Sequence, residues 1–193
     1  MPLPFPDPGM TDGVVRIRRW RRDDLDDLVV ACQDPDIARW TSVPSPYTDA
    51  TGTWFLDRCD EWWAAGSDLP LAIVDDATGA LLGATGVHRI GAAPDAPDLG
   101  GLPDEVGYWL AAWARGRGFV TRGVQQLADW WFTTLDRPVL WLRARTDNVP
   151  SLAVAHRCGF RPTGVTMPDD DDPTASVAVF RRDRDATPDG RVS

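Results

Sequence analysis

The feature that most constrains the fold is a glycine turn between a strand-like segment and an amphipathic helix. Residues 105–112, EVGYWLAA, have the composition of a strand, and the turn RGRG follows at residues 115–118. Beyond the turn, apolar side chains recur at helical spacing and polar ones occupy the other face. The apolar set is Val120, Val124, Leu127, Trp131 and Leu135. This pattern predicts a half-buried helix that begins near Val120, directly after a strand and a tight turn.

Such a turn is a candidate anion site. The start of a helix leaves several backbone N–H groups unpaired and concentrates positive charge there, and glycine lets a ligand approach. A pyrophosphate is the ligand that suits it best. Two other phosphate motifs do not fit, because a dinucleotide-binding fingerprint needs glycine where Thr121 stands, and a P-loop needs lysine, which the chain lacks. The alternative is an ordinary turn with solvated arginines.

Composition narrows the class of protein. A chain of 193 residues that is 43% hydrophobic can bury one core, so we expect one domain. The formal charge of −9 argues against general nucleic-acid binding, and the basic run at residues 16–22 is interpreted as the solvated face of a first strand. Three cysteines without a CxxC pair favour reduced thiols and a cytoplasmic location. No apolar run approaches the ~20 residues that a membrane span needs.

The remaining segments alternate between strand and helix patterns. Strands are expected at 14–20, in a hairpin at 69–90, and at 139–146, 160–166 and 175–181; helices are expected at 23–33, 47–66 and 147–158. We expect residues 1–13 to be a flexible, proline-rich arm, 14–181 to be the domain and 182–193 to be a disordered tail. The run DDDD at 169–172 lacks the spacing of a calcium loop, so it is interpreted as a solvated loop.

Four segments together resemble a known family. EVGYWL at 105–110, RGRGFV at 115–120 and NVPSLAVAHRCGF at 148–160 occur in the order and spacing of the GCN5-related N-acetyltransferases, and DPDIARWTSVPSPYT at 34–48 is similar to one branch of them. That branch acetylates protein N-termini and includes the ribosomal-protein alanine acetyltransferases. The resemblance covers about residues 14 to 181. It implies a single α/β (α+β) domain with a mixed, mostly antiparallel sheet of six to seven strands, splayed between the fourth and fifth and flanked by about four helices.

The resemblance also implies a site for acetyl-CoA as acyl donor. The family's pyrophosphate motif maps to Arg115, Gly118 and Val120, where valine replaces the usual small residue. Two further departures are Arg122 and His156, which stand where relatives often carry glutamate or another acid. The implied cofactor contacts are Trp109, Leu110, Ala111, Arg115, Gly116, Arg117, Gly118, Phe119, Val120, Thr121, Asn148 and Ser151.

Amine acetylation requires a neutral nucleophile, so a group beside the pocket must accept a proton. Glu105 opens the family's catalytic strand and is the candidate base, with Asp104 as the neighbour that could replace it; otherwise Glu105 is a surface carboxylate at a strand end. A backbone N–H near Leu110 would stabilise the oxyanion. Relatives often use a tyrosine to assist the leaving thiolate, but here Ser151 is the hydroxyl at that place. Both Ser151 and Asn148 have an alternative structural role, at the start of a helix.

The expected function is transfer of an acetyl group to a primary amine, with a protein N-terminus as one acceptor. A small amine such as an antibiotic or polyamine is the alternative acceptor, and a catalytically silent acyl-CoA-binding module is the alternative from another class. A homodimer is left open, and His88 and His156 lie too far apart in sequence to suggest a metal site. Four tryptophans could line the acceptor pocket, although at least two are expected in the core: Trp40, Trp54, Trp62 and Trp63.

Overall fold

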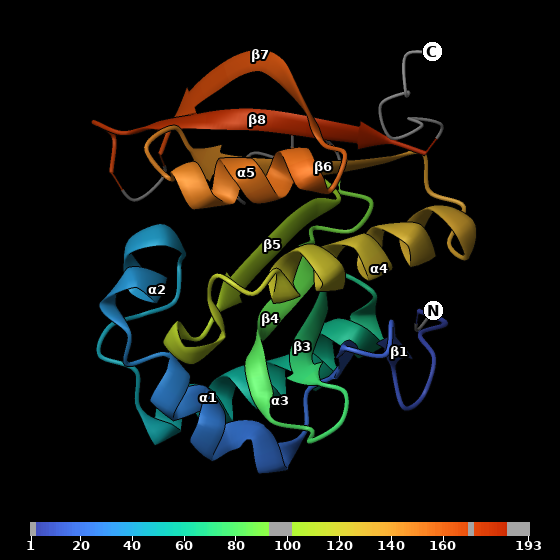
Figure 1. Cartoon of the computed structure of the whole chain (residues 1–193), viewed down its shortest axis with the longest axis vertical. Coiled ribbons are helices and arrows are strands. Elements are labelled where there is room, and N and C mark those ends of the chain that lie inside the picture. The colour runs from blue at the N-terminus through green and yellow to red at the C-terminus, as the bar shows by residue number, and fades with distance from the viewer. Residues whose placement is uncertain (1–2, 93–101, 170–171, 185–193) are drawn as a thin grey trace.

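The computed structural model describes residues 3–92, 102–169 and 172–184. They form one domain around an eight-stranded sheet of order β1-β2-β3-β4-β5-β6-β8-β7 (Figure 1). The strands are β1 Met10–Thr11, β2 Val15–Arg19, β3 Leu69–Asp75, β4 Leu81–His88, β5 Glu105–Leu110, β6 Val139–Arg145, β7 Arg161–Pro168 and β8 Ser176–Asp183. Every neighbouring pair is antiparallel except β5 and β6, so the expected mixed, mostly antiparallel sheet is confirmed.

The additional strand lies in the segment that was expected to be a loose arm. Strand β1 pairs with β2, and the ring of Phe5 meets Trp63 and Trp130 edge-on at centroid distances of 5.5 Å and 5.2 Å. The described part of the arm therefore packs on the core. The apolar side chains of Phe5 and Met10 hold this proline-rich segment against the core cluster.

The helices are α1 Leu25–Ala31, α2 Pro35–Trp40, α3 Asp49–Ala65, α4 Phe119–Thr133 and α5 Val149–Arg157, with 3-10 turns at Arg22–Asp24 and Ala112–Ala114. Helix α2 is the one that the sequence pattern did not predict. Its start carries a standard signal, because the Asp34 carboxylate accepts the N–H of Asp36 and Pro35 takes the first helical position.

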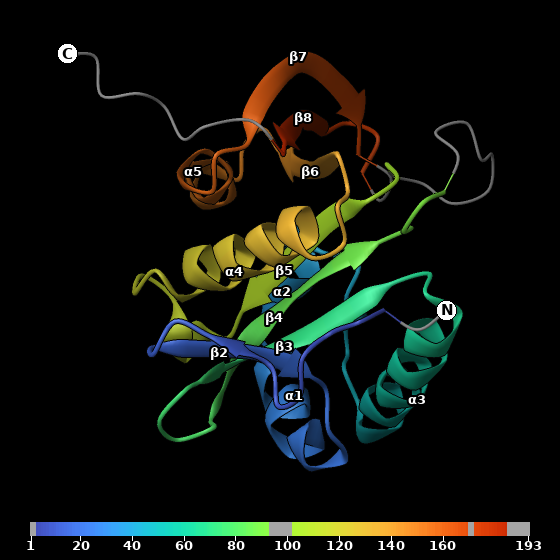
Figure 2. The ribbon, with the colours of Figure 1, turned by 90° about the vertical axis from the view of Figure 1, so that its right-hand side faces the viewer.

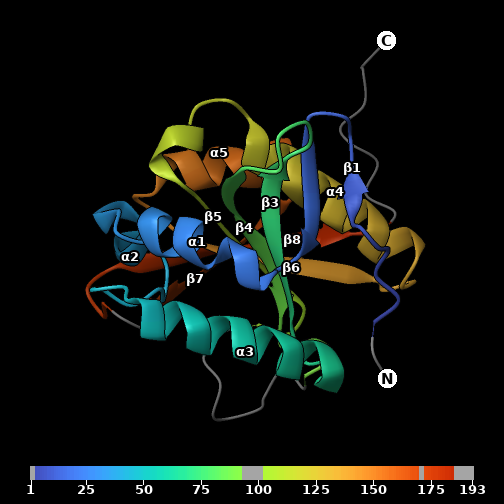
Figure 3. The same cartoon turned by 90° about the horizontal axis from the view of Figure 1, so that it is seen from below.

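The helices cover both faces of the sheet. Helices α1 and α3 lie on one face, and α4 and α5 lie on the other (Figures 2 and 3). Apolar residues of α4, such as Leu127 and Trp131, pack in the larger core cluster, while Leu28 of α1 and Leu56 of α3 form a second cluster. Glycine at 123 permits this packing, since a Cβ there would lie 3.0 Å from Ile73.

The sheet divides between β5 and β6. These parallel strands have a single register pair, Glu105 with Trp141, supported by a 3.1 Å hydrogen bond from the Trp141 N–H to the Asp104 carbonyl. Beyond that pair the strands diverge, which confirms the splay expected between the fourth and fifth strands of the domain. We call this opening the fork; β5 and β6 are its two arms.

Carboxylates hold part of the basic run at 16–22, whereas Arg19, Arg21 and Arg22 are exposed. Arg18 is buried and forms a two-point ion pair with Asp24, at 2.7 Å and 2.8 Å, and Arg16 pairs with Asp76 at 2.7 Å. Apolar and basic residues therefore do alternate at residues 15–18, but the arginine side chains of this strand are only partly solvated.

The three cysteines are free and buried. Burial raises the pKa of each thiol to about 12, so all three are neutral at ordinary pH. Among the described residues, no helix combines the length and the apolar character that crossing a bilayer would require.

Candidate functional site

The start of α4 presents a row of unused backbone donors. Gly116 and Gly118 have φ angles of 74° and 77°, a region that favours glycine. Within the described residues, the backbone N–H groups from Gly116 to Thr121 donate no hydrogen bond, and the helix ladder begins with the N–H of Arg122 bonded to the Gly118 carbonyl at 3.2 Å. A Cβ built at either glycine would meet nothing within 4 Å. The turn can therefore accept an anion at close range.

A hollow of about 580 Å³ lies against this turn. Its walls combine Thr121 with arginine side chains from the turn, from α4 and from the end of α5. These arginines are Arg117, Arg122 and Arg157. Asp12, from the segment before β2, also lines it and pairs with Arg122 at 2.6 Å. Sequence reasoning found the turn but missed Arg157 and Asp12, which lie far from it in the chain.

The backbone of β5 turns alternate residues toward the fork. The Ala111 N–H bonds to the Leu82 carbonyl on the β4 side, whereas the Asp104 carbonyl accepts the Trp141 N–H on the β6 side. Because backbone groups alternate along a strand, the N–H of Leu110 faces the open fork. Of the residues expected to contact the cofactor, Leu110 is thus placed to donate into the fork, and Ala111 is committed to the sheet.

Several expected contact residues can take part only through their backbone. The side chains of Phe119 and Val120 are buried in the larger core cluster, and Trp109 packs beside Trp20 on the other face of the sheet. The guanidinium of Arg117 lies over the Phe119 ring, 4.5 Å from its centroid. The valine at 120 therefore fills core space rather than the phosphate approach.

A tyrosine spans the fork from β5 to α5. The Tyr108 hydroxyl lies 2.9 Å from Ser151 Oγ and donates to the Ser151 carbonyl at 3.2 Å. Burial raises the pKa of this phenol, so it stays protonated at neutral pH. Asn148 is the N-cap of α5, and its Oδ1 accepts the Ser151 N–H at 3.2 Å. Sequence reasoning searched for a tyrosine in the helix and overlooked the one that reaches it from the facing strand.

Glu105 lies at the closed end of the fork and is already bonded. Its carboxylate accepts Arg143 Nε at 3.0 Å and 3.1 Å and the Leu102 N–H at 2.9 Å. A carboxylate has about four acceptor positions, so roughly one remains for a water or an amine. Asp104 is less available, because it is buried and its Oδ1 accepts the Gly91 N–H at 2.8 Å. His88 stands directly across from Glu105 on β4 and contacts Asp68 at 3.3 Å.

Helix α2 contacts both arms of the fork. Arg115, after β5, pairs with Asp34 at 2.7 Å and Asp36 at 3.2 Å, and donates to the Leu110 carbonyl at 3.3 Å. The Arg145 guanidinium, at the end of β6, lies 5.3 Å from the Trp40 ring centroid. The Arg115 side chain is therefore bound to α2 and does not line the hollow at the start of α4.

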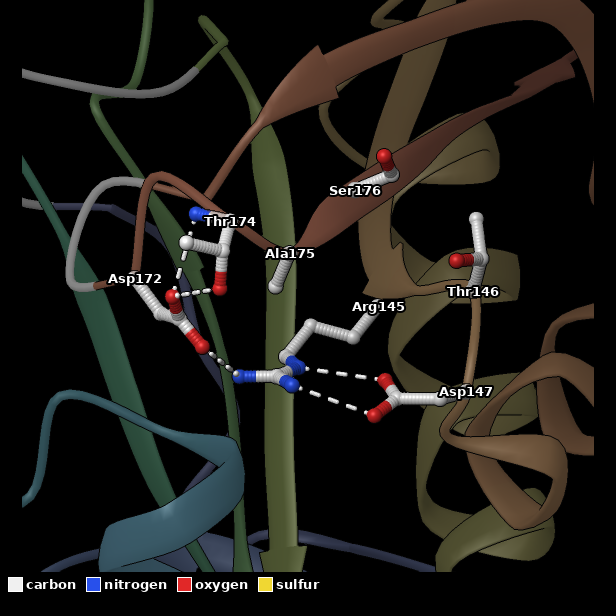
Figure 4. A pocket seen from close by; sticks show the side chains of 7 residues that line it. All are labelled: Arg145, Thr146, Asp147, Asp172, Thr174, Ala175 and Ser176. Atoms are coloured by element: carbon white, nitrogen blue, oxygen red, sulfur yellow. Dashed lines mark hydrogen bonds and ion pairs between the residues drawn. The ribbon is translucent and has the colours of Figure 1, made fainter.

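A second, smaller hollow of about 290 Å³ lies at the end of β6 (Figure 4). There Arg145 bonds both oxygens of Asp147 at 3.1 Å and pairs with Asp172 at 3.6 Å. Asp172, from the acidic run, also accepts two bonds from Thr174; residues 170–171 of that run lie outside the described residues. In the part of the chain that the structure describes, no group of three or more His, Cys, Asp or Glu is placed to hold a metal.

The fork, the glycine turn and α5 lie within a segment that matches a family model described as an acetyltransferase (GNAT) domain, over residues 15–161. The chain belongs to the GNAT acetyltransferase family. It is therefore an acyltransferase that uses acetyl-CoA as donor. The family assignment covers the turn, both arms of the fork and α2.

Comparisons with individual proteins agree with this family. The chain is 25% identical to the uncharacterized N-acetyltransferase p20 of Bacillus licheniformis over 149 residues, 75% of this chain and 79% of that protein. Its fold matches the microcin C7 self-immunity acetyltransferase MccE, solved with acetyl-CoA and AMP, with a TM-score of 0.80 at 17% identity, covering 93% and 98% of the chains. It also matches the ribosomal-protein-S5-alanine acetyltransferase of Vibrio fischeri, with a TM-score of 0.77 at 18% identity and the same coverage.

Proposed function

We propose that this GNAT protein acetylates the free α-amine of a peptide or protein N-terminus, with the pyrophosphate of acetyl-CoA on the turn at 116–121. The observation that carries the cofactor half of the proposal is the row of unused N–H groups from Gly116 to Thr121 beside an arginine-lined hollow. Several N–H groups that the chain leaves unused at the start of a helix can bind one anion together. The acetyl end then lies in the fork.

The fork holds the groups that acyl transfer needs. Glu105 accepts the proton of the attacking ammonium, directly or through one water, at the acceptor position that Arg143 and Leu102 leave open. The Leu110 N–H faces the fork and stabilises the oxyanion that forms when the amine attacks the thioester carbonyl. The C–N bond forms in that attack, and the C–S bond breaks when the oxyanion collapses, so that coenzyme A leaves as a thiolate. The second proton that the nitrogen loses passes to this thiolate.

Tyr108 and Ser151 assist that leaving thiolate as a pair. The Tyr108 phenol has one proton, which either the Ser151 carbonyl or Ser151 Oγ accepts; when Oγ accepts it, the serine hydroxyl becomes a better donor to sulfur. Tyr108 lies 2.9 Å from Ser151 Oγ and keeps its proton at neutral pH, because burial raises its pKa. The sulfur is thus bonded by Ser151, and Tyr108 orients and polarises that hydroxyl from the opposite side of the fork.

The acceptor approaches from the face of the sheet that carries α1, α2 and α3. Val106 and Tyr108 of β5 face the core cluster in which α4 packs. Because side chains alternate along a strand, the Glu105 side chain lies on the opposite face of the sheet. The similarity in fold to a ribosomal-protein alanine acetyltransferase supports a protein N-terminus. The similarity to MccE supports a second candidate, a small molecule that carries a primary amine.

A panel of amines tests the proposal. Release of the coenzyme A thiol is measured with short peptides that begin with alanine or serine, with the same peptides blocked at the N-terminus but carrying an internal lysine, and with small polyamines or aminoglycosides. We expect turnover with the free N-termini and none with the blocked peptides. Turnover confined to the small amines supports the second candidate, and coenzyme A binding without turnover on any amine contradicts both.

A further inference from the structure

The hollow at the start of α4 has more cationic groups than a pyrophosphate on backbone amides requires. Three arginines line it, at 117, 122 and 157, against one carboxylate, Asp12. The chain as a whole has a formal charge of −9, so this hollow reverses the sign of the average surface. A ligand with anionic groups beyond the pyrophosphate fits such a concentration of guanidinium groups.

The three arginines differ in how far they are already engaged. Arg117 lies over the Phe119 ring, and Arg122 is paired with Asp12 at 2.6 Å. The exposed Arg157 guanidinium has no hydrogen bond or ion pair among the described residues. The backbone from which this side chain extends is anchored, because the Arg157 carbonyl accepts Gln125 Nε2 at 3.2 Å and so joins the end of α5 to α4.

We propose that Arg157, assisted by Arg122, binds the 3′-phosphate of coenzyme A, and that the protein thereby distinguishes coenzyme A from its 3′-dephospho form. This inference rests on the proposed function, which places the pyrophosphate on the adjoining turn. The 3′-phosphate is a phosphomonoester with up to two negative charges, and a guanidinium matches its oxygens with paired donors. It is the group of coenzyme A that an unengaged arginine beside the pyrophosphate can recognise.

Asp12 opposes this recognition. Its Oδ2 holds Arg122, while its Oδ1 accepts the N–H groups of Val14 and Val15 at 3.0 Å each. A phosphate near Arg122 has to share that guanidinium with a carboxylate of like charge. Removing the charge of Asp12 while keeping Oδ1 is therefore expected to strengthen binding of the 3′-phosphate, a gain that damage to the fold cannot produce.

Calorimetry with coenzyme A and 3′-dephospho-coenzyme A tests the proposal. The wild-type protein is expected to bind coenzyme A about tenfold more tightly, as a charge-assisted contact at an exposed site allows. Arg157→Ala should weaken coenzyme A binding about tenfold and leave the affinity for the dephospho form unchanged. Asp12→Asn should strengthen coenzyme A binding by about threefold, again without changing the dephospho form.

Arg58→Ala is the matched control, because it removes one exposed arginine from α3, on the other face of the sheet. It should change neither affinity. Equal binding of the two ligands by the wild-type protein, or equal weakening of both by Arg157→Ala, overturns the inference while leaving the proposed function intact. Failure of coenzyme A to bind the wild-type protein at all contradicts the proposed function instead.

Discussion

The start of α4 and the closed end of the fork differ in how much of their hydrogen-bonding capacity the chain itself uses. The N–H groups from Gly116 to Thr121 donate to no described residue, whereas Glu105 is bonded by Arg143 and Leu102. The first region is prepared to receive a ligand without breaking any contact. The second holds a reactive group in one orientation and leaves it little spare capacity. We therefore propose that the cofactor binds where the backbone donors are unused and that proton transfer occurs where the carboxylate is already held.

The largest expected effect on kcat comes from replacing Glu105, at the closed end of the fork. Glu105→Gln keeps the size of the side chain and removes its basicity, so kcat should fall by roughly 10²- to 10⁴-fold, with the affinity for coenzyme A nearly unchanged. Steady-state kinetics and calorimetry on the same preparation measure both quantities.

Asp104→Asn is the matched control for Glu105→Gln. It neutralises the adjacent carboxylate but keeps an oxygen for the Gly91 N–H. Activity should be largely retained. If Glu105→Gln stays active and Asp104→Asn does not, Asp104 is the base and Glu105 only orients the strands through Arg143.

A smaller effect is expected across the fork. Tyr108→Phe removes one hydroxyl that contacts Ser151, which corresponds to about 1 kcal/mol and so to a decrease in kcat of about fivefold. Ser151→Ala should cost somewhat more. Because the two hydroxyls act as a pair, the double variant should be no slower than Ser151→Ala. Fully additive effects would show that Tyr108 acts independently of Ser151.

The smallest effect is expected for the ion pairs that join Arg115, before the glycine turn, to the start of α2. The resemblance to the family assigns Arg115 to the pyrophosphate, whereas the structure binds its side chain to Asp34 and Asp36. With that side chain 39% exposed, Arg115→Ala should raise the KM for the acceptor only about two- to threefold and leave the affinity for coenzyme A unchanged. Asp34→Asn keeps the helix cap and should reproduce this effect. A selective loss of coenzyme A affinity in Arg115→Ala would restore the family's assignment.

Most of the fold follows from local patterns in the sequence. The helical period of α4 and the strand before the turn follow from local sequence patterns, and the family motifs predict the position of the splay. The missed elements are short or depend on distant partners. Helix α2 has six residues and is marked only by its cap, and β1 has two residues that need β2 to pair with.

Only part of the candidate site can be predicted from the sequence, because the rest also depends on contacts between distant residues. Gly116 and Gly118 lie in one contiguous motif, so their turn can be recognised locally. Tyr108 and Ser151 are 43 positions apart, and Asp12 and Arg122 are 110 apart, so their contacts exist only after the sheet has formed. The sequence also does not show which hydrogen bonds a side chain already makes. Glu105 is an example, because its partner Arg143 comes from the other arm of the fork.

The central claim is that the amides of the glycine turn hold the pyrophosphate. Gly118→Val tests it, since valine adds bulk in the phosphate approach, but valine is also strained at the φ of 77° that this position requires. Gly118→Asn separates the two effects, because asparagine tolerates this conformation and still places a side chain in the approach.

The most direct measurement is the dissociation constant of coenzyme A for wild type and Gly118→Asn, with circular dichroism to show that both are folded. We expect a folded variant whose affinity for coenzyme A falls at least about tenfold, because the ligand loses charge-assisted bonds to several backbone amides. A folded Gly118→Asn that binds coenzyme A as tightly as wild type would contradict it.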